Sequence, residues 1–225
     1  MPSTHSTTRQ IAVTVDVVLL TLRDGRLQVL LMRREHDPFA GQLALPGGYI
    51  HPQQDDDAGA AARRVLADKT GVRAPYLEQL YTYASGARDP RGWSVSIAFY
   101  ALVSEQALRR TGREVFELLD ADALPHLSFD HNRIVETALD RLRNKSAYSS
   151  LPCYLLPDRF TLTELQQTYE QVMGVPLEKS AFRRKLADLG FVEPVPGARQ
   201  TGQHRPAQLY SLKAGARLAI FERPF

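Results

Sequence analysis

The chain has 225 residues, of which 44% are hydrophobic and 24% are charged, and it contains 14 glycines and 14 prolines. This composition excludes collagen-like, low-complexity and intrinsically disordered classes, and the length predicts two domains of unequal size. The formal net charge of +3 arises after residue 157, because residues 1–157 carry equal numbers of acidic and basic side chains.

No part of the sequence predicts export or membrane insertion. The longest apolar stretch, Ile11–Leu22, is interrupted by Asp16 and is too short to cross a bilayer. Residues 1–10 lack the apolar region of a signal peptide, and we expect them to be disordered. The single cysteine, Cys153, excludes an intrachain disulfide and a multi-cysteine zinc cluster, so its expected role is packing. We therefore expect a cytoplasmic protein without membrane contact.

The first predicted elements form a β-hairpin followed by a loop. Ile11–Leu22 and Leu27–Arg33 are rich in Val, Ile and Leu, and Asp24-Gly25 between them is a strong signal for a tight turn. The next segment, residues 38–49, is rich in Pro and Gly and therefore predicts a loop between two regular elements.

An amphipathic helix is predicted over Asp55–Thr70. Its apolar residues, spaced three and four apart, are Ala58, Ala61, Ala62, Val65 and Leu66. Three aspartates, 55–57, suit the N-terminal end of the helix dipole, and Gly71 suits its C-cap.

The rest of the first unit mixes strands and a helix. Strands are predicted over Tyr76–Tyr83 and Ser94–Val103, on either side of the polar loop 85–92, and a helix is predicted over His131–Arg143. Residues 11–148 are therefore expected to form one α/β domain.

A second, smaller domain is expected over residues 158–225, after a linker at 149–157. Thr161 and Glu164 form a capping box that opens a helix ending at Gly174, and a second helix is predicted over Glu178–Leu189. A short segment, Phe191–Glu193, a polar loop, 194–207, and a strand, Gln208–Leu212, follow. Two short helices joined by a tight turn and followed by a β-ribbon are typical of a winged helix-turn-helix.

Leu45-Pro46-Gly47-Gly48, followed at a distance by residues 64–72, resembles the Nudix box. In that box a Gly-Gly loop leads into a helix that carries an arginine and several glutamates. The approach segment Arg33-Arg34 and Pro38-Phe39 is also similar to that family, so the resemblance covers roughly residues 11–145. It implies an α/β/α sandwich. The box of this chain is two residues longer than the standard one.

The acidic positions of the box are changed in this chain. Active Nudix hydrolases carry glutamates four residues apart, which places two carboxylates on one helix face to hold divalent cations beside a pyrophosphate. Here those positions are Val65 and Lys69, the loop glutamate is replaced by Gln54, and Asp68 alone stays acidic. We therefore expect no bound metal, no cofactor and no hydrolysis. An alternative is a metal site rebuilt from the aspartates at 55–57, and with it an active ADP-ribose or nucleoside-diphosphate pyrophosphatase.

Together with the basic C-terminal helix, the changed box makes nearly the whole chain similar to the Nudix-related transcriptional regulators of the NrtR type. That resemblance implies a homodimeric repressor of NAD-biosynthesis genes, whose Nudix cleft senses ADP-ribose or a related NAD metabolite. The residues expected to bind the effector are Arg34, Phe39, Gly47, Gly48, Arg88, Asp89 and Arg91.

The ligand-side residues each have an alternative role. Arg88-Asp89-Pro90-Arg91 is similar to the loop that ADP-ribose-binding Nudix proteins place over the ligand, or it is a turn with an internal Arg–Asp contact. Trp93 is either an adenine platform or an ordinary residue at the start of a strand. Some relatives sense sugars, so a sugar-responsive regulator is a further alternative.

The basic helix supports a role in DNA binding. A helix of this length fits the major groove, and its basic residues lie on the face opposite Phe182 and Leu186. The alternatives are a solvated helix face and, for residues 199–205, a merely disordered loop. The expected partner is double-stranded DNA with an inverted repeat. The residues expected to contact it are Lys179, Ser180, Arg183, Arg184, Arg199, His204 and Arg205.

Overall fold

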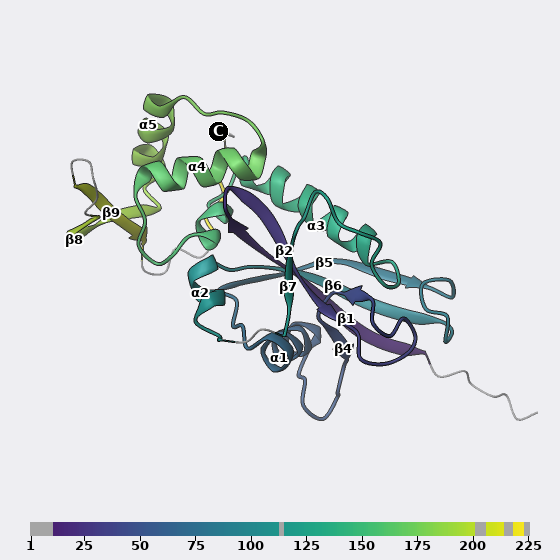
Figure 1. The fold of residues 1–225 in the computed structure, drawn as a ribbon. Helices are drawn as coiled ribbons and strands as arrows, with labels where there is room; N and C mark the ends of the chain where they lie inside the picture. Colours follow the sequence, from purple (N-terminus) through teal and green to yellow (C-terminus); the bar gives the residue numbers. More distant parts are fainter. Residues whose placement is uncertain (1–10, 113–114, 201–205, 214–217, 223–225) are drawn as a thin grey trace, which may run out of the picture.

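A computed structural model describes residues 11–112, 115–200, 206–213 and 218–222 (Figure 1). The expected disorder of residues 1–10 lies outside this range. The elements are β1 (Ala12–Arg23), β2 (Arg26–Arg33), β3 (Leu43–Ala44), β4 (Gly47–Tyr49), α1 (Ala58–Thr70), β5 (Tyr76–Ser85), β6 (Ser94–Leu102), α2 (Glu105–Arg109), β7 (Glu117–Asp120), α3 (His131–Ser146), the 3-10 helix η1 (Leu151–Leu155), α4 (Leu162–Met173), α5 (Lys179–Leu189), β8 (Val192–Gln200) and β9 (Ala207–Leu212).

A mixed sheet with β1 at its centre organises the first domain. The strand order is β3-β2-β1-β6-β5, while β4 also pairs with β1 and β7 with β2. β1 runs antiparallel to β2 and parallel to β6. The predicted hairpin is confirmed: Arg23 pairs with Arg26, and Asp24 and Gly25 both have positive φ angles, as a type I′ turn requires.

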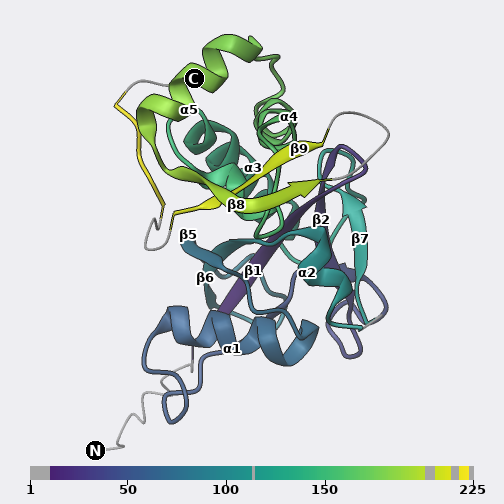
Figure 2. The same cartoon turned by 90° about the vertical axis from the view of Figure 1, so that its left-hand side faces the viewer.

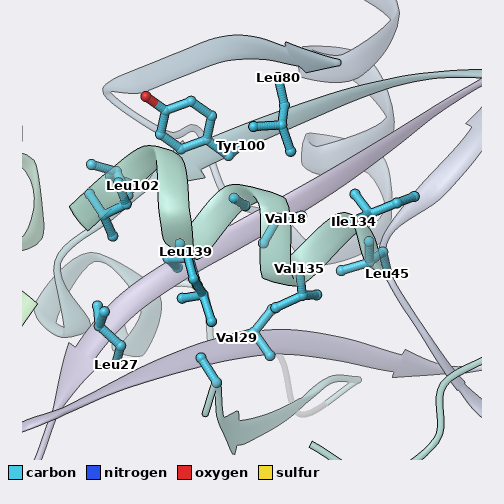
Figure 3. Close-up of a cluster of buried hydrophobic side chains, with 14 of the residues drawn as sticks. Val18, Leu27, Val29, Leu45, Leu80, Tyr100, Leu102, Ile134, Val135 and Leu139 are labelled. Carbon is cyan, nitrogen blue, oxygen red and sulfur yellow. The ribbon is translucent and has the colours of Figure 1, made fainter. Parts of the chain in front are cut away.

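Helices cover both faces of this sheet, which confirms the expected α/β/α sandwich. From Val15 to Leu20, β1 is apolar apart from Asp16, because its side chains alternate between two cores. Val18 and Leu20 belong to the core that also contains Ile134 and Val135 of α3. Figure 3 shows Val18 beside that helix. Val15, Val17 and Leu19 face α1, where they pack with Ala61, Ala62, Val65 and Leu66. Figure 1 shows α3 and α1 on opposite sides of the strands.

The second domain is the expected winged helix (Figure 2). The capping box is present: the Thr161 side chain accepts a hydrogen bond from the Glu164 backbone, and the Glu164 carboxylate accepts one from the Thr161 backbone. α4 and α5 pack through Tyr169 and Phe182, whose ring centroids are 5.5 Å apart. β8 and β9 form the ribbon beside them. Cys153 is buried in this core, as expected, and its burial raises the pKa of the thiol.

The segment 149–157, expected to be a linker, is a packed part of the structure. η1 contributes Leu151 and Leu155 to the core under α3 and Cys153 to the core of the winged helix. The Tyr169 hydroxyl donates a hydrogen bond to the Ser149 carbonyl oxygen at 2.7 Å. The apolar residues of segment 149–157 therefore pack into the cores of both domains, so the segment is not a flexible linker.

Several expected boundaries need correction. β8 continues to Gln200, where a loop was expected from Pro194, because both strands of a two-stranded ribbon are edges and tolerate proline. α1 begins at Ala58, so the aspartates at 55–57 precede it instead of forming its first turn. Neither α2 nor β7 was expected from the sequence, and two short strands, β3 and β4, lie in the segment that was expected to be a loop. In the described part of the chain, none of the helices has the length and apolar character needed to cross a bilayer.

Candidate functional site

A cavity of about 910 Å³ opens beside the Gly47-Gly48 segment. Its walls come from β1, β4, α1, the loops after β2 and β5, and the start of α3. Six of the seven residues expected to bind an effector line it: Arg34, Gly47, Gly48, Arg88, Asp89 and Arg91. Phe39 is not one of the lining residues, but its ring packs edge-on against the lining residue Phe129, with centroids 4.9 Å apart. Trp93 also lies off the lining, beside the backbone of Gly86.

The two glycines let β4 approach its neighbours closely. A Cβ atom on Gly47 would lie 2.1 Å from Asp16 Oδ1, and one on Gly48 would lie 3.0 Å from Val65 Cγ2. The first distance is shorter than real Cβ contacts show, and the second would require the Val65 side chain to shift by a few tenths of an ångström, so the two glycines favour the position of β4 between β1 and α1. This packing fixes the α1 face that carries Val65 and Lys69 next to the cavity.

The donor set on that face does not fit Mg²⁺. Val65 is 3% exposed and belongs to the apolar core, as its place in the helical stripe predicts. Among the described residues, no group of three or more His, Cys, Asp or Glu side chains is arranged to hold a metal ion. Hard divalent cations need several oxygen ligands, and α1 offers Asp68 next to the ammonium group of Lys69 on the cavity wall.

Two of the three aspartates at 55–57 have structural partners. The Asp57 side chain caps α1 by accepting a hydrogen bond from Ala60 N at 2.6 Å. Asp55, whose side chain is 1% exposed, accepts hydrogen bonds from both Nε and Nη2 of Arg64 at 2.7 Å. These bonds, with one from the His51 backbone, lower the pKa of Asp55 to about 2 despite the opposing effect of burial. The segment therefore anchors the loop to α1.

An Asp55→Asn variant should be less stable than the wild type at neutral pH, and the gap should narrow in acid. The depressed pKa means that Asp55 stabilises the fold above its unfolded pKa of about 3.9, and that this stability is lost as the pH falls toward 2. Urea unfolding at about pH 7 and about pH 3 measures both gaps. The exposed neighbour gives a matched control, Asp56→Asn, with little effect at either pH. A gap for Asp55→Asn that is equal at both pH values would contradict the assignment.

A buried ionic network forms the inner wall of the cavity. Arg88, whose side chain is 7% exposed, contacts both carboxylate oxygens of Asp130, at 2.9 and 3.1 Å, and lies 3.5 Å from Asp16. Asp16 in turn accepts a hydrogen bond from Ser96 at 2.5 Å. His131 Nδ1 accepts one from Leu45 N at 3.0 Å, and burial lowers the pKa of its imidazole, which keeps it neutral at pH 7. The network joins β1, β6 and the start of α3.

Sequence reasoning missed the role of Asp16, Asp130 and His131. Asp16 was seen as an interruption of an apolar stretch, but a carboxylate in a buried central strand needs a partner, and that is the signal that was available. Asp130 and His131 lie 42 or more residues from Arg88 and Leu45, their partners, so spacing along the chain carries no signal for them.

Arg91 and Arg34 lie nearer the cavity mouth. Arg91 pairs with Asp89 at 2.7 Å, so the internal Arg–Asp contact expected as an alternative is present, yet the Arg91 side chain stays 50% exposed. The Arg34 guanidinium lies 4.7 Å from the ring centroid of Phe129 and donates to the carbonyl oxygens of Pro38 and His36. Burial, followed by the charge of Arg91, lowers the pKa of Arg34, so this wall favours an anion.

The second candidate surface is the outer face of α5. Lys179, Ser180, Arg183 and Arg184 are all exposed, while Phe182 and Leu186 on the opposite face are buried. The Glu178 carboxylate caps the helix by accepting from the backbone of Ser180 and Ala181. Arg199 is exposed on β8. His204 and Arg205 lie outside the described residues.

Comparison with known proteins places both domains in one family. A NUDIX domain model matches residues 11–138, and a model of the NrtR DNA-binding winged helix domain matches residues 152–212. Over 201 residues the chain is 41% identical to the ADPR responsive transcriptional repressor NtrR of Acinetobacter baylyi, covering 88% of this chain and 80% of that protein. The chain belongs to the NrtR family of transcriptional regulators.

Solved NrtR structures resemble both the whole chain and its first domain. Shewanella oneidensis NrtR complexed with a 27mer DNA matches with a TM-score of 0.87 and 38% identity, covering 95% of this chain and 99% of that one. The NUDIX domain of the same protein complexed with ADP ribose matches with a TM-score of 0.51 and 38% identity, covering 60% of this chain and 90% of that one.

Proposed function

We propose that this protein is a DNA-binding transcriptional repressor that responds to ADP-ribose or a related NAD metabolite. Residues 11–148 form the effector domain and residues 158–225 the DNA-binding domain. One observation carries the proposal: the chain joins a cation-lined cavity to a helix with an exposed basic face. The genes under its control are those of NAD biosynthesis, as the family resemblance implies.

The cavity suits a nucleotide in size and charge. Its volume of about 910 Å³ lies within the range of small-molecule sites, about 300–1,000 Å³. Arginine presents several N–H groups in a planar fork that matches phosphate oxygens, and both Arg34 and Arg91 line the cavity. The related domain of Shewanella oneidensis NrtR, solved with ADP ribose, supports the same ligand here.

We expect the protein to bind ADP-ribose without hydrolysing it at a rate above background. A metal-assisted reaction needs carboxylates to hold the cation that activates water, and Val65 and Lys69 provide none. The rate of AMP release from ADP-ribose in the presence of Mg²⁺ measures hydrolysis. An active Nudix hydrolase is the positive control. Robust Mg²⁺-dependent cleavage by the pure protein would instead support the pyrophosphatase alternative.

The α5 face should read DNA in the major groove. Lys179→Ala or Arg183→Ala should weaken DNA binding by about 1–3 kcal/mol where a base contact is lost, with relaxed sequence preference. Loss of a phosphate contact should weaken binding to all sequences alike and lower the salt slope by about one. Gel shifts on upstream DNA over a range of salt concentrations separate these results.

Arg109→Ala is the matched control for the DNA experiment. Arg109 is a 71% exposed cation of α2, in the other domain, and its loss changes the net charge by the same amount. If the α5 variants bind DNA no worse than Arg109→Ala does, α5 is not the recognition helix.

A symmetric dimer is part of the proposal. One helix reads only a few base pairs, so useful specificity needs two half-sites related by a two-fold axis, as in an inverted repeat. The contact between copies lies in the Nudix-like domain, which leaves the basic face of α5 free. Light scattering gives the mass of the protein in solution. A monomer that binds DNA with one half-site as tightly as DNA with both half-sites would contradict the proposed dimer.

Helix α3 offers the route between the two sites. Its first residue, His131, lines the cavity, and Asp130 just before it holds Arg88. Its other end packs against α4 and leads to Ser149, which binds the Tyr169 hydroxyl. A ligand that draws Arg88 away from Asp130 therefore acts on a rigid element that touches the DNA-binding domain.

A further inference from the structure

Lys69 lines the cavity at a position where the Nudix box of active hydrolases has a metal-binding glutamate. It lies in the last turn of α1, four residues after Val65, and its side chain contributes to the cavity wall. In the box of an active hydrolase these two positions hold a divalent cation. Here one of them is buried in the apolar core, and the other carries a positive charge of its own.

Most cations of the cavity wall already have a carboxylate partner. Arg64 pairs with Asp55 and Arg88 with Asp130, and the same holds for Arg33 and Arg91. Within the described ranges, Lys69 and Arg34 are the lining Lys and Arg residues that have no carboxylate oxygen within 4 Å. Their charges are therefore available to an anion in the cavity.

The surroundings of Lys69 favour an anionic partner. The Lys69 side chain is exposed, yet partial burial lowers its pKa. Of the nearby charges, Asp16 opposes this shift most, Arg34 adds to it, and Glu35 opposes it. Two cations that repel one another across a cavity gain most from an anion placed between them. A diphosphate diester, with one negative charge on each phosphate group, balances both.

We propose that the Lys69 ammonium group takes the place of the divalent cation and binds the diphosphate of the effector, together with Arg34. This inference rests on the proposed function, because it assigns the site where the ADP-ribose diphosphate lies. An ammonium group supplies three hydrogen-bond donors and a fixed charge, so binding needs no metal. It is not a Lewis acid and does not turn water into hydroxide, so the ligand is held without being cleaved.

Calorimetry with ADP-ribose tests the assignment, using the full-length protein in EDTA and again in MgCl₂. The wild type should bind equally well in both buffers. Lys69→Met should weaken binding about ten- to a hundredfold, the usual effect of losing a charge-assisted phosphate contact. Lys69→Arg keeps the charge and should recover most of the affinity.

Arg63→Met is the matched control, since Arg63 lies on the same helix, is 65% exposed and is absent from the cavity wall. Thermal unfolding of each variant establishes that it is folded. The assignment is overturned if the folded Lys69→Met variant binds ADP-ribose as tightly as Arg63→Met does, or if the wild type needs Mg²⁺ to bind. These outcomes leave the proposed function intact, whereas a wild type that does not bind ADP-ribose in either buffer overturns both.

Discussion

The Arg88→Met variant is expected to lose about 3–5 kcal/mol of unfolding free energy, the range for removing one partner of a buried ion pair. The large cost arises because two carboxylates lose their partner at once. Asp130 loses a two-point contact, and Asp16, itself 10% exposed, loses the cation 3.5 Å away. Methionine keeps much of the volume, so the measured loss reports the charge rather than a cavity. Urea unfolding at pH 7 measures it.

An exposed ion pair between an arginine and an aspartate provides the control for this variant. Arg26, 74% exposed, contacts Asp120 at 3.1 Å, and Arg26→Met should cost less than about 1 kcal/mol because solvent screens the pair. Equal losses for the two variants would mean that the network around Asp16 does not hold the inner wall of the cavity together. Because Asp130 precedes α3 directly, Arg88→Met should also weaken the effect of ADP-ribose on DNA binding.

Phe182→Ala should destabilise the winged helix by about 3–5 kcal/mol, the usual cost of truncating a buried phenylalanine. The ring is 2% exposed and packs edge-on against Tyr169 in a small core, which leaves few neighbours able to fill the gap. DNA binding should be lost, since the same turn of α5 carries Arg183. ADP-ribose binding should survive, because the cavity lies in the other domain.

Truncation of an exposed apolar residue is the control for Phe182→Ala. Val175, 51% exposed in the turn before α5, should tolerate alanine with a loss of no more than about 0.5 kcal/mol. If Phe182→Ala unfolds at the same denaturant concentration as Val175→Ala, the α4–α5 contact is not the core of this domain. If ADP-ribose binding is lost with DNA binding, the two domains do not fold independently enough for the proposed division.

The elements that could be predicted from the sequence are those set by local chemistry. A tight hairpin turn requires positive φ angles at its two central residues, and Asp24-Gly25 adopts them readily. The capping box of Thr161 and Glu164 likewise sets the start of α4. Gly71 caps α1 in a left-handed conformation for the same local reason. The face of α5 followed from helical periodicity, because Phe182 and Leu186 have to point inward.

The features that could not be predicted depend on contacts distant in sequence. Arg88 finds its partner 42 residues away, and η1 is buried because two cores meet around it. β8 runs through Pro194 and Pro196 at the edge of a two-stranded ribbon, and Gln208 donates hydrogen bonds to the carbonyl oxygens of Val195 and Ala198 where the register is irregular. In each case the local signal, a charged loop or a proline, favours a structure that tertiary packing overrides.

The central claim is that filling the cavity changes how the protein binds DNA. Fluorescence anisotropy with labelled operator DNA, titrated with the full-length protein in EDTA, measures the affinity with and without saturating ADP-ribose. Coupling between two sites typically changes affinity by about 5- to 150-fold, so we expect a shift of at least about fivefold. Calorimetry on the same preparation establishes that the cavity is occupied. Superimposable DNA-binding curves with and without bound ADP-ribose would contradict the account.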